Sequence, residues 1–167
     1  PSSDGFTGQI IISKAGDWTF SIIANPPEKI WIRNPPTKNF LTFVPVFNSL
    51  LLVGTGAGIG PLLSVLSSPI MASMKAEGRQ IRVMWVVHDP EAAHWDFVHQ
   101  IIEKIDPNPK IFDSRKFRPD VAFESCYMAQ ECDLEAVMVV SNPKVTNSVV
   151  QEVKASGRAA YGAVFDS

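Results

Sequence analysis

Four glycines stand at every second position of one short segment, and this arrangement could hold a phosphate group. The segment reads VGTGAGIGP, with Gly54, Gly56, Gly58 and Gly60. A residue without Cβ adopts positive φ and lets the backbone approach a ligand closely. If a helix begins near Pro61, its free N–H groups and its dipole favour a diphosphate there. The spacing matches neither G-x-G-x-x-G nor a P-loop. On spacing alone, a tight strand-to-helix turn is therefore an equally good interpretation.

The histidines and serines of the chain lack the partner residues that metal binding or serine hydrolysis requires. The three histidines are spaced six and five residues apart, which does not place them all on one face of a helix. We therefore predict no metal site. Ser64 and Ser141 belong to no G-x-S-x-G segment and have no His and Asp partners in the expected order. Serine hydrolysis is not expected.

The composition describes one globular domain of ordinary size. The 167 residues are 46% hydrophobic and 19% charged, and the formal net charge is −2. This charge argues against a nucleic-acid surface. No apolar run approaches the roughly 20 residues that cross a bilayer, so we expect no membrane contact from this segment itself. The first residues lack Met and a signal-peptide pattern, as expected for a cut inside a larger protein.

The glycines and Ser141 stand where expected strands and helices alternate. Expected strands cover Leu50–Val53, Ile81–Val87, Pro109–Asp113, Ala136–Val140 and Ala159–Phe165. Expected helices begin near Pro61 and cover Pro90–Ile105, Asp120–Ala129 and Lys144–Ala155, the last closed by Gly157. This alternation predicts an α/β fold with a doubly wound parallel sheet and helices on both faces. Ligands bind such sheets at the carboxyl ends of the strands, at the point where the strand order reverses.

The first part of the chain has a different character. Gln9–Ser13 and Lys29–Arg33 have the composition of short strands, and Asp17 is a helix N-cap candidate. The segment Ala24–Phe40 contains four prolines, which favour extended, turn-rich backbone. This part predicts the margin of a small β structure whose other strands lie outside the chain.

Several segments resemble the ferredoxin–NADP reductase superfamily in the correct order. GTGAGIGPLLS (54–64) is similar to its nicotinamide-side loop GTGTGIAP, and GDWT (16–19) is similar to a segment of NADPH-oxidase and ferric-reductase members. Further similar segments are 83–98, FRPD (117–120), VSNP (140–143) and the aromatic end at 161–165. The resemblance covers nearly the whole chain. It implies a Rossmann-like NAD(P)-binding domain over 47–167, preceded over 1–46 by a linker and a remnant of a flavin-binding β-barrel.

The resemblance also assigns roles to individual residues. Thr55 and Ser141 would flank the nicotinamide, and Phe165 would shield the flavin face. The residues expected at the nucleotide diphosphate are Gly54, Thr55, Gly56, Ala57, Gly58, Asn142 and Pro143. Those expected at the flavin diphosphate are Gly16, Asp17, Trp18 and Thr19, and those at the adenosine half of the nucleotide are His88, Asp89, Ser114, Arg115 and Arg118.

The sequence leaves NADP and NAD open as the nucleotide. Asp89 follows the second expected strand, where an acidic side chain accepts from a ribose hydroxyl and suits NADH. The nearby cationic group around Arg115, Lys116 and Arg118 could instead hold a 2′-phosphate, or it could be a solvated loop. Of the two nucleotides, we expect NADP(H).

Two functions follow from the resemblance. The first is the nucleotide-binding module of a flavin-dependent oxidoreductase that passes hydride from NAD(P)H to FAD, with FAD held mostly by sequence outside the chain. Its partners would be a flavin domain and an electron-acceptor module. The second is a catalytically degenerate domain that senses nucleotides or binds proteins, because Ser141 and Asn142 replace the family's Cys and Gly, and Ala57 and Asn34 also depart from the pattern. Either domain would face the cytoplasm, tethered to a membrane or to a larger multidomain protein.

Overall fold

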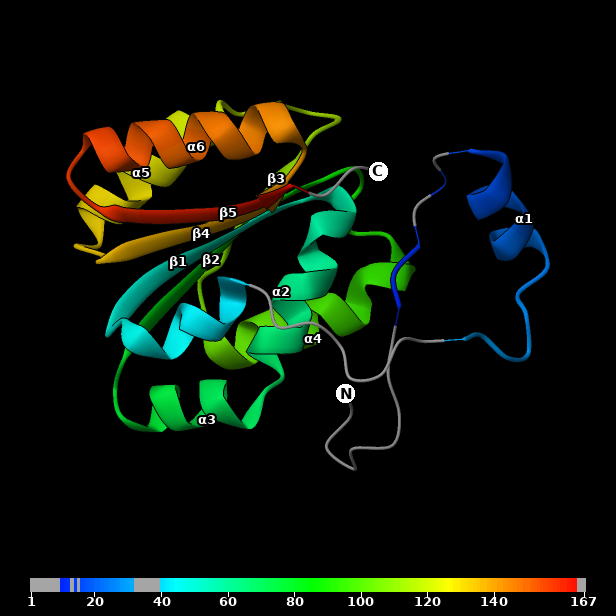
Figure 1. The fold of residues 1–167 in the computed structure, drawn as a ribbon, viewed down its shortest axis with the longest axis horizontal. Helices are drawn as coiled ribbons and strands as arrows, with labels where there is room; N and C mark the ends of the chain where they lie inside the picture. Colours follow the sequence, from blue (N-terminus) through cyan, green and yellow to red (C-terminus); the bar gives the residue numbers. More distant parts are fainter. Residues whose placement is uncertain (1–9, 13, 15, 32–39, 165–167) are drawn as a thin grey trace.

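Five strands form one parallel sheet in the order β3-β2-β1-β4-β5 (Figure 1). The computed structural model describes residues 10–12, 14, 16–31 and 40–164. The strands are β1 (Ser49–Thr55), β2 (Gln80–Val87), β3 (Lys110–Asp113), β4 (Ala136–Ser141) and β5 (Ala159–Val164). All four pairings are parallel. The predicted doubly wound α/β fold is confirmed, whereas the flavin-barrel remnant stays a prediction.

Helices cover both faces of the sheet because the strands are apolar on both sides. Leu50 and Leu52 of β1 pack into one cluster, and Leu51 and Val53 pack into the other; all four are fully buried. The first cluster includes residues of α2 (Ile59–Leu66), α3 (Pro69–Ala76) and α4 (Asp96–Ile105). The second includes residues of α5 (Val121–Glu131) and α6 (Pro143–Ala155). Successive side chains of a strand point to opposite faces, so a continuous apolar run requires a helix layer on each side.

Side-chain caps fix where several helices begin. Asp120 accepts hydrogen bonds from the backbone of Ala122 and Phe123 at the start of α5. Helix α3 was missed by the sequence analysis, although Ser68 accepts from Met71 N at 3.3 Å and Pro69 follows it. Helix α6 ends just before Gly157, whose φ of +83° matches the predicted cap.

The first helix differs from the prediction at its start and in its surroundings. Helix α1 (Asp17–Ala24) is capped by Gly16, so the assignment of Asp17 as the cap is wrong. The described residues of the two expected N-terminal strands, 10–12 and 29–31, are in no strand, because a strand needs a hydrogen-bonded neighbour and none pairs with them. Helix α1 buries no residue and stands apart from the sheet in Figure 1.

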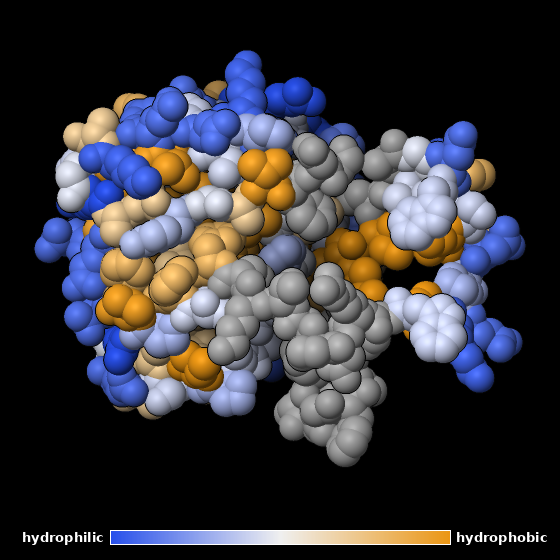
Figure 2. Space-filling view, in the orientation of Figure 1, coloured by the Kyte–Doolittle hydropathy of each residue, from blue (hydrophilic) through white to orange (hydrophobic). Residues whose placement is uncertain are grey.

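Three short 3₁₀ segments complete the described structure: η1 (Phe40–Val46), η2 (Gly56–Gly58) and η3 (Ala93–Trp95). Figure 2 shows hydrophobic surface over η1 and β5, to which Phe43, Val46 and Tyr161 contribute exposed side chains. Considering the described residues alone, no single helix is long and apolar enough to cross a bilayer. The pair Gly56–Leu66 and Pro69–Ala76, bent by 70°, passes that test only when its members are taken together.

Candidate nucleotide-binding site

The strand order reverses between β1 and β4, and two hydroxyl groups meet at that point. From β1 the chain proceeds outward to β2 and β3, then returns to place β4 on the other side of β1. Thr55 ends β1 and Ser141 ends β4. Their hydroxyl oxygens are 2.6 Å apart, and Ser141 is 1% exposed. One hydroxyl donates to the other, so the pair keeps one O–H proton for a further acceptor.

Removing one hydroxyl of this pair tests how firmly it fixes the two strand ends. We expect Ser141→Ala to lower the free energy of unfolding by about 1 kcal/mol, because the half-buried Thr55 hydroxyl loses its hydrogen-bond partner. Urea denaturation measures the change. Ser64→Ala is the control, since Ser64 is exposed on α2 and its loss is expected to change stability by less than about 0.5 kcal/mol. Equal effects of the two substitutions would contradict the assignment.

The glycine loop follows β1 directly, and two of its positions need glycine for different reasons. Gly56 has a φ of +51°, and a Cβ at this position would meet no atom within 4 Å. Gly58 has an ordinary φ of −59°, but its Cβ would lie 2.5 Å from the Val140 carbonyl oxygen. Gly58 is therefore required by the close packing of the loop on β4, and Gly56 by its left-handed backbone. The loop is a tight strand-to-helix turn that also leaves open space at Gly56.

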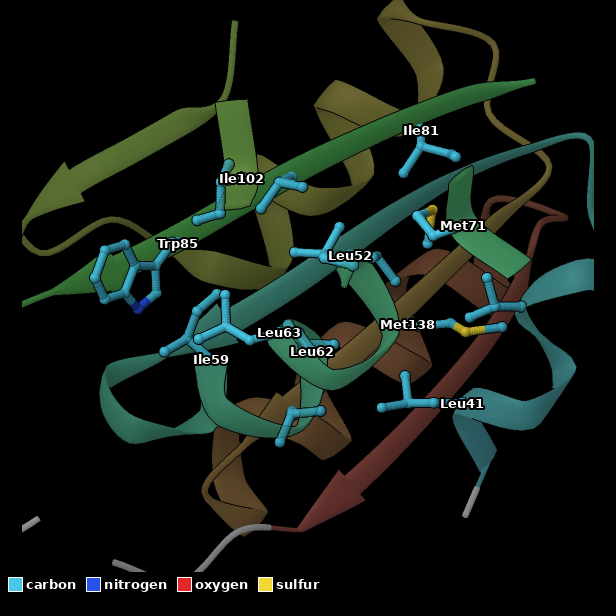
Figure 3. Close-up of a cluster of buried hydrophobic side chains, with 14 of the residues drawn as sticks. Leu41, Leu52, Ile59, Leu62, Leu63, Met71, Ile81, Trp85, Ile102 and Met138 are labelled. Carbon is cyan, nitrogen blue, oxygen red and sulfur yellow. The ribbon is translucent and has the colours of Figure 1, made fainter. Parts of the chain in front are cut away.

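A buried tryptophan holds the loop from the neighbouring strand. The Trp85 indole Nε1 on β2 donates to the Gly56 carbonyl at 3.1 Å, and the ring is fully buried. Figure 3 shows Trp85 beside Ile59, at the start of α2. Trp85 also meets Trp95 edge-on, with ring centroids 5.1 Å apart. The sequence analysis had not linked Trp85 to the loop, because its apolar surroundings predict only a core position.

The end of β4 is fixed by the residues that follow it. Asn142 caps α6, since its Oδ1 accepts from Val145 N at 3.0 Å, and Pro143 is the first helical residue. The Thr146 hydroxyl, which is buried, donates to the Ser141 carbonyl at 3.0 Å. Thr146 was also missed, because no local pattern distinguishes it from other helical residues. The amino ends of α2 and α6 thus lie at the same edge of the sheet as the hydroxyl pair.

Asp89, Arg115 and Asp113 form a second cluster at this edge, beyond the ends of β2 and β3. Arg115 Nη2 lies 2.7 Å from Asp113 Oδ2 and 2.9 Å from Asp89 Oδ1. The hydrogen bond from Arg115 holds the pKa of the Asp113 carboxyl well below its usual range, and the same contact raises the pKa of Arg115. Ser114 N donates to the Val87 carbonyl at 2.9 Å. The structure therefore places Arg115 against Asp89 and Asp113, and Ser114 against the end of β2; the binding roles of Asp89, Ser114 and Arg115 stay predictions.

The remaining predicted adenosine residues, His88 and Arg118, are exposed in the loops after β2 and before α5. The other two histidines have local contacts: His99 Nε2 is hydrogen-bonded to the Pro90 carbonyl at 2.8 Å, and His94 packs on Trp95. Across the described residues, no three His, Cys, Asp or Glu side chains are grouped so that they could hold a metal ion.

The predicted flavin-side residues are not joined to this site. Trp18 is 72% exposed on α1, and the Thr19 hydroxyl is hydrogen-bonded to Gly16 N at 3.0 Å. Helix α1 lies away from the glycine loop (Figure 1), so Gly16–Thr19 and the hydroxyl pair are separate. Phe165 lies outside the described residues. The binding roles assigned to all these residues stay predictions.

Most of the chain matches one protein family, and two curated proteins are similar to all or nearly all of it. The model of the family "Adenylate-forming reductase 03009, C-terminal domain" matches residues 40–167. Adenylate-forming reductase 03009 of Coprinopsis cinerea is 33% identical over 168 residues, which are 100% of this chain and 15% of that protein. Adenylate-forming reductase 06235 of the same organism is 35% identical over 170 residues, which are 99% of this chain and 16% of that protein. The chain thus spans less than one fifth of the length of these curated relatives.

Solved structures are similar at lower sequence identity. The C-terminal domain of a hydrogenase from Pyrococcus furiosus superposes with a TM-score of 0.52 at 14% identity, over 68% of this chain and 89% of that chain. This likeness supports the fold alone. Ferredoxin-NADP+ reductase from Plasmodium falciparum matches with a TM-score of 0.46 at 15% identity, over 71% of this chain and 53% of that chain.

Proposed function

Because the chain belongs to the family of the C-terminal domain of adenylate-forming reductase 03009, we propose that it binds NAD(P)H and presents the nicotinamide for hydride transfer to a flavin. The observation that carries the proposal is the Thr55–Ser141 hydroxyl pair, 2.6 Å apart at the point where the strand order reverses. Nucleotides bind open α/β sheets at this point. Both curated relatives are named as reductases, which supports a nucleotide-binding reductase module.

The glycine loop suits the nucleotide diphosphate for three reasons. The space above Gly56 is free of protein atoms within 4 Å of a Cβ position. The Gly56 carbonyl is bound by the buried Trp85 indole, so an acceptor that would repel phosphate is turned into the protein. The N-termini of α2 and α6 lie at this edge and favour negative charge. The proton that the hydroxyl pair retains can be donated to the carboxamide of the nicotinamide.

A flavin, when bound, supplies the acceptor for the hydride. The described residues fit it only in part: the start of α1 at Gly16 could face its diphosphate, but α1 buries none of its residues. We therefore expect FAD to be held mainly by sequence outside this chain, and this chain alone to bind it weakly. A flavin domain and an electron-acceptor module of the same longer protein are the proposed partners, and a cytoplasmic-facing location is proposed with them.

Nucleotide titration tests the proposal. The chain, and a version extended upstream through the flavin-binding sequence, are titrated with NADH and NADPH while binding is followed by calorimetry. The extended protein is also examined for bound FAD and for bleaching of the flavin absorbance after nucleotide is added. Binding followed by bleaching is the expected result. If neither nucleotide binds at millimolar concentration, the proposed function is wrong.

A second candidate is a reductase-like domain that binds the nucleotide without turnover. The observation in its favour concerns Ser141, which stands where the ferredoxin–NADP reductase superfamily has a Cys. Ser141 is 1% exposed and hydrogen-bonded to Thr55. A buried, partnered hydroxyl is less available to a reacting ring than an exposed thiol. Nucleotide binding to the extended protein without flavin bleaching would identify this second function.

A further inference from the structure

The ion pairs at the ends of β2 and β3 bear on which nucleotide the site selects. This inference rests on the proposed function. Arg115 contacts Asp89, and a free arginine at this place would favour a 2′-phosphate. In the structure, however, Arg115 is already engaged by two carboxylates. Its Nε lies 3.0 Å from Asp113 Oδ1, and its Nη2 lies 2.7 Å from Asp113 Oδ2 and 2.9 Å from Asp89 Oδ1.

Asp113 holds Arg115 in a two-pronged contact that is hard to replace. The Asp113 side chain is only 8% exposed, and it also accepts from the backbone N–H of Arg115 at 3.0 Å. Planar bidentate pairing of this kind is the strongest form of the arginine–carboxylate contact. These contacts use the Nε–H and the Nη2 N–H groups of Arg115. A phosphate would have to approach through Nη1, beside two carboxylates that already offset the charge of Arg115.

Asp89 is placed to accept a hydrogen bond rather than to tolerate a phosphate. Its φ of +55° turns the backbone just beyond β2, and its side chain is 38% exposed. Its Oδ1 contacts Arg115, and its second carboxylate oxygen, Oδ2, can accept a hydrogen bond from a ribose hydroxyl. A 2′-phosphate in the same position would meet a carboxylate of like charge.

We propose that Asp89, fixed by the Arg115–Asp113 pair, makes the site selective for NADH over NADPH. The expectation of NADP(H) came from the cationic group Arg115, Lys116 and Arg118, and the contacts of Arg115 with two carboxylates weaken the contribution of that residue. Asp89 and Arg115 thus become specificity-determining residues: Asp89 receives the 2′-hydroxyl, and Arg115 orients Asp89.

Asp89→Asn tests the proposal with a matched control. Asparagine is tolerated at positive φ, so the backbone turn is retained while one charge and one strong acceptor are lost. Asp133→Asn is the control, because Asp133 also has positive φ (+49°) and an arginine partner, Arg158 at 3.7 Å, but lies after α5 at the opposite edge of the sheet. Dissociation constants for NADH and NADPH are measured for both variants and for the unchanged chain.

The unchanged chain is expected to bind NADH at least about tenfold more tightly than NADPH, and Asp89→Asn is expected to shift that ratio about tenfold toward NADPH. Asp133→Asn is expected to leave the ratio unchanged. The affinities of 5′-AMP and adenosine 2′,5′-bisphosphate are also compared, because these compounds differ in the 2′-phosphate and lack the nicotinamide half. We expect 5′-AMP to bind more tightly.

Two outcomes overturn the proposal and are distinguishable from a failure of the proposed function. Tighter binding of NADPH, abolished by Arg118→Ala, would assign the 2′-phosphate to Arg118 and would leave the proposed function intact. Equal effects of Asp89→Asn and Asp133→Asn would show that Asp89 has no special role. Absence of binding by either nucleotide would instead refute the proposed function itself.

Discussion

Gly58→Ala is expected to destabilise the domain by about 1–3 kcal/mol and to abolish nucleotide binding. The added Cβ would lie 2.5 Å from the Val140 carbonyl oxygen, which belongs to a buried central strand and cannot move aside as a flexible side chain could. The loop would have to shift away from β4, and the backbone N–H groups proposed to bind the diphosphate would shift with it. Thermal unfolding and nucleotide titration measure the two effects.

Gly60→Ala is the matched control for this substitution. Gly60 lies two residues further on, within α2, and its Cβ would meet Ile11 Cδ1 at 3.6 Å, an ordinary contact distance. Alanine is also favoured over glycine inside a helix. Stability and binding are therefore expected to be unchanged or slightly improved. A similar loss in both variants would show that the loop tolerates no side chain for reasons other than its packing on β4.

Trp85→Phe is the second substitution with a large expected effect. The change removes the donor to the Gly56 carbonyl and leaves that acceptor beside a buried ring, which costs about 1–3 kcal/mol. Because Gly56 forms part of the proposed diphosphate site, nucleotide affinity is expected to fall together with stability. Denaturation and titration of the same preparation establish whether the two losses occur together.

Trp95→Phe is the control for Trp85→Phe, because it makes the same reduction in ring size without removing a hydrogen bond to the loop. The Trp95 indole Nε1 is buried and, among the described residues, has no hydrogen-bond partner, so its removal relieves an unsatisfied donor. We expect Trp95→Phe to be less destabilising than Trp85→Phe and to leave nucleotide affinity unchanged. If both variants lose affinity equally, the Trp85–Gly56 hydrogen bond does not position the loop.

The sheet could be predicted from sequence because its signals are local. Leu50–Val53 and Ala136–Val140 are continuous apolar runs, and both lie in buried central strands. The short strand Lys110–Asp113 was also expected. Helix α3 was missed, although Ser68 and Pro69 form a cap-and-proline signal that could have located it. The expected N-terminal strands failed for a different reason: a strand exists only with a neighbour, which composition cannot supply.

The contacts that define the candidate site could not be read from sequence. Trp85 reaches Gly56 because the register pairs Gly54 with Trp85 across β1 and β2. The Thr55–Ser141 contact joins residues 86 positions apart, and only the family resemblance placed them together. Arg115 is paired with both Asp113 and Asp89, and Asp89 has a left-handed backbone that no local pattern predicts. The sequence indicates that Asp89 and Arg115 are neighbours, but it does not show that Arg115 is already paired with two carboxylates.

The packing of Gly58 on the Val140 carbonyl has a consequence for the speed of recognition. Contacts with β4 and with Trp85 fix the loop conformation. If the loop binds the diphosphate as proposed, little conformational entropy is lost on association, because this backbone is ordered beforehand. The encounter would proceed as a single bimolecular step without a slower rearrangement, and differences in affinity between nucleotides would arise from how fast each one leaves.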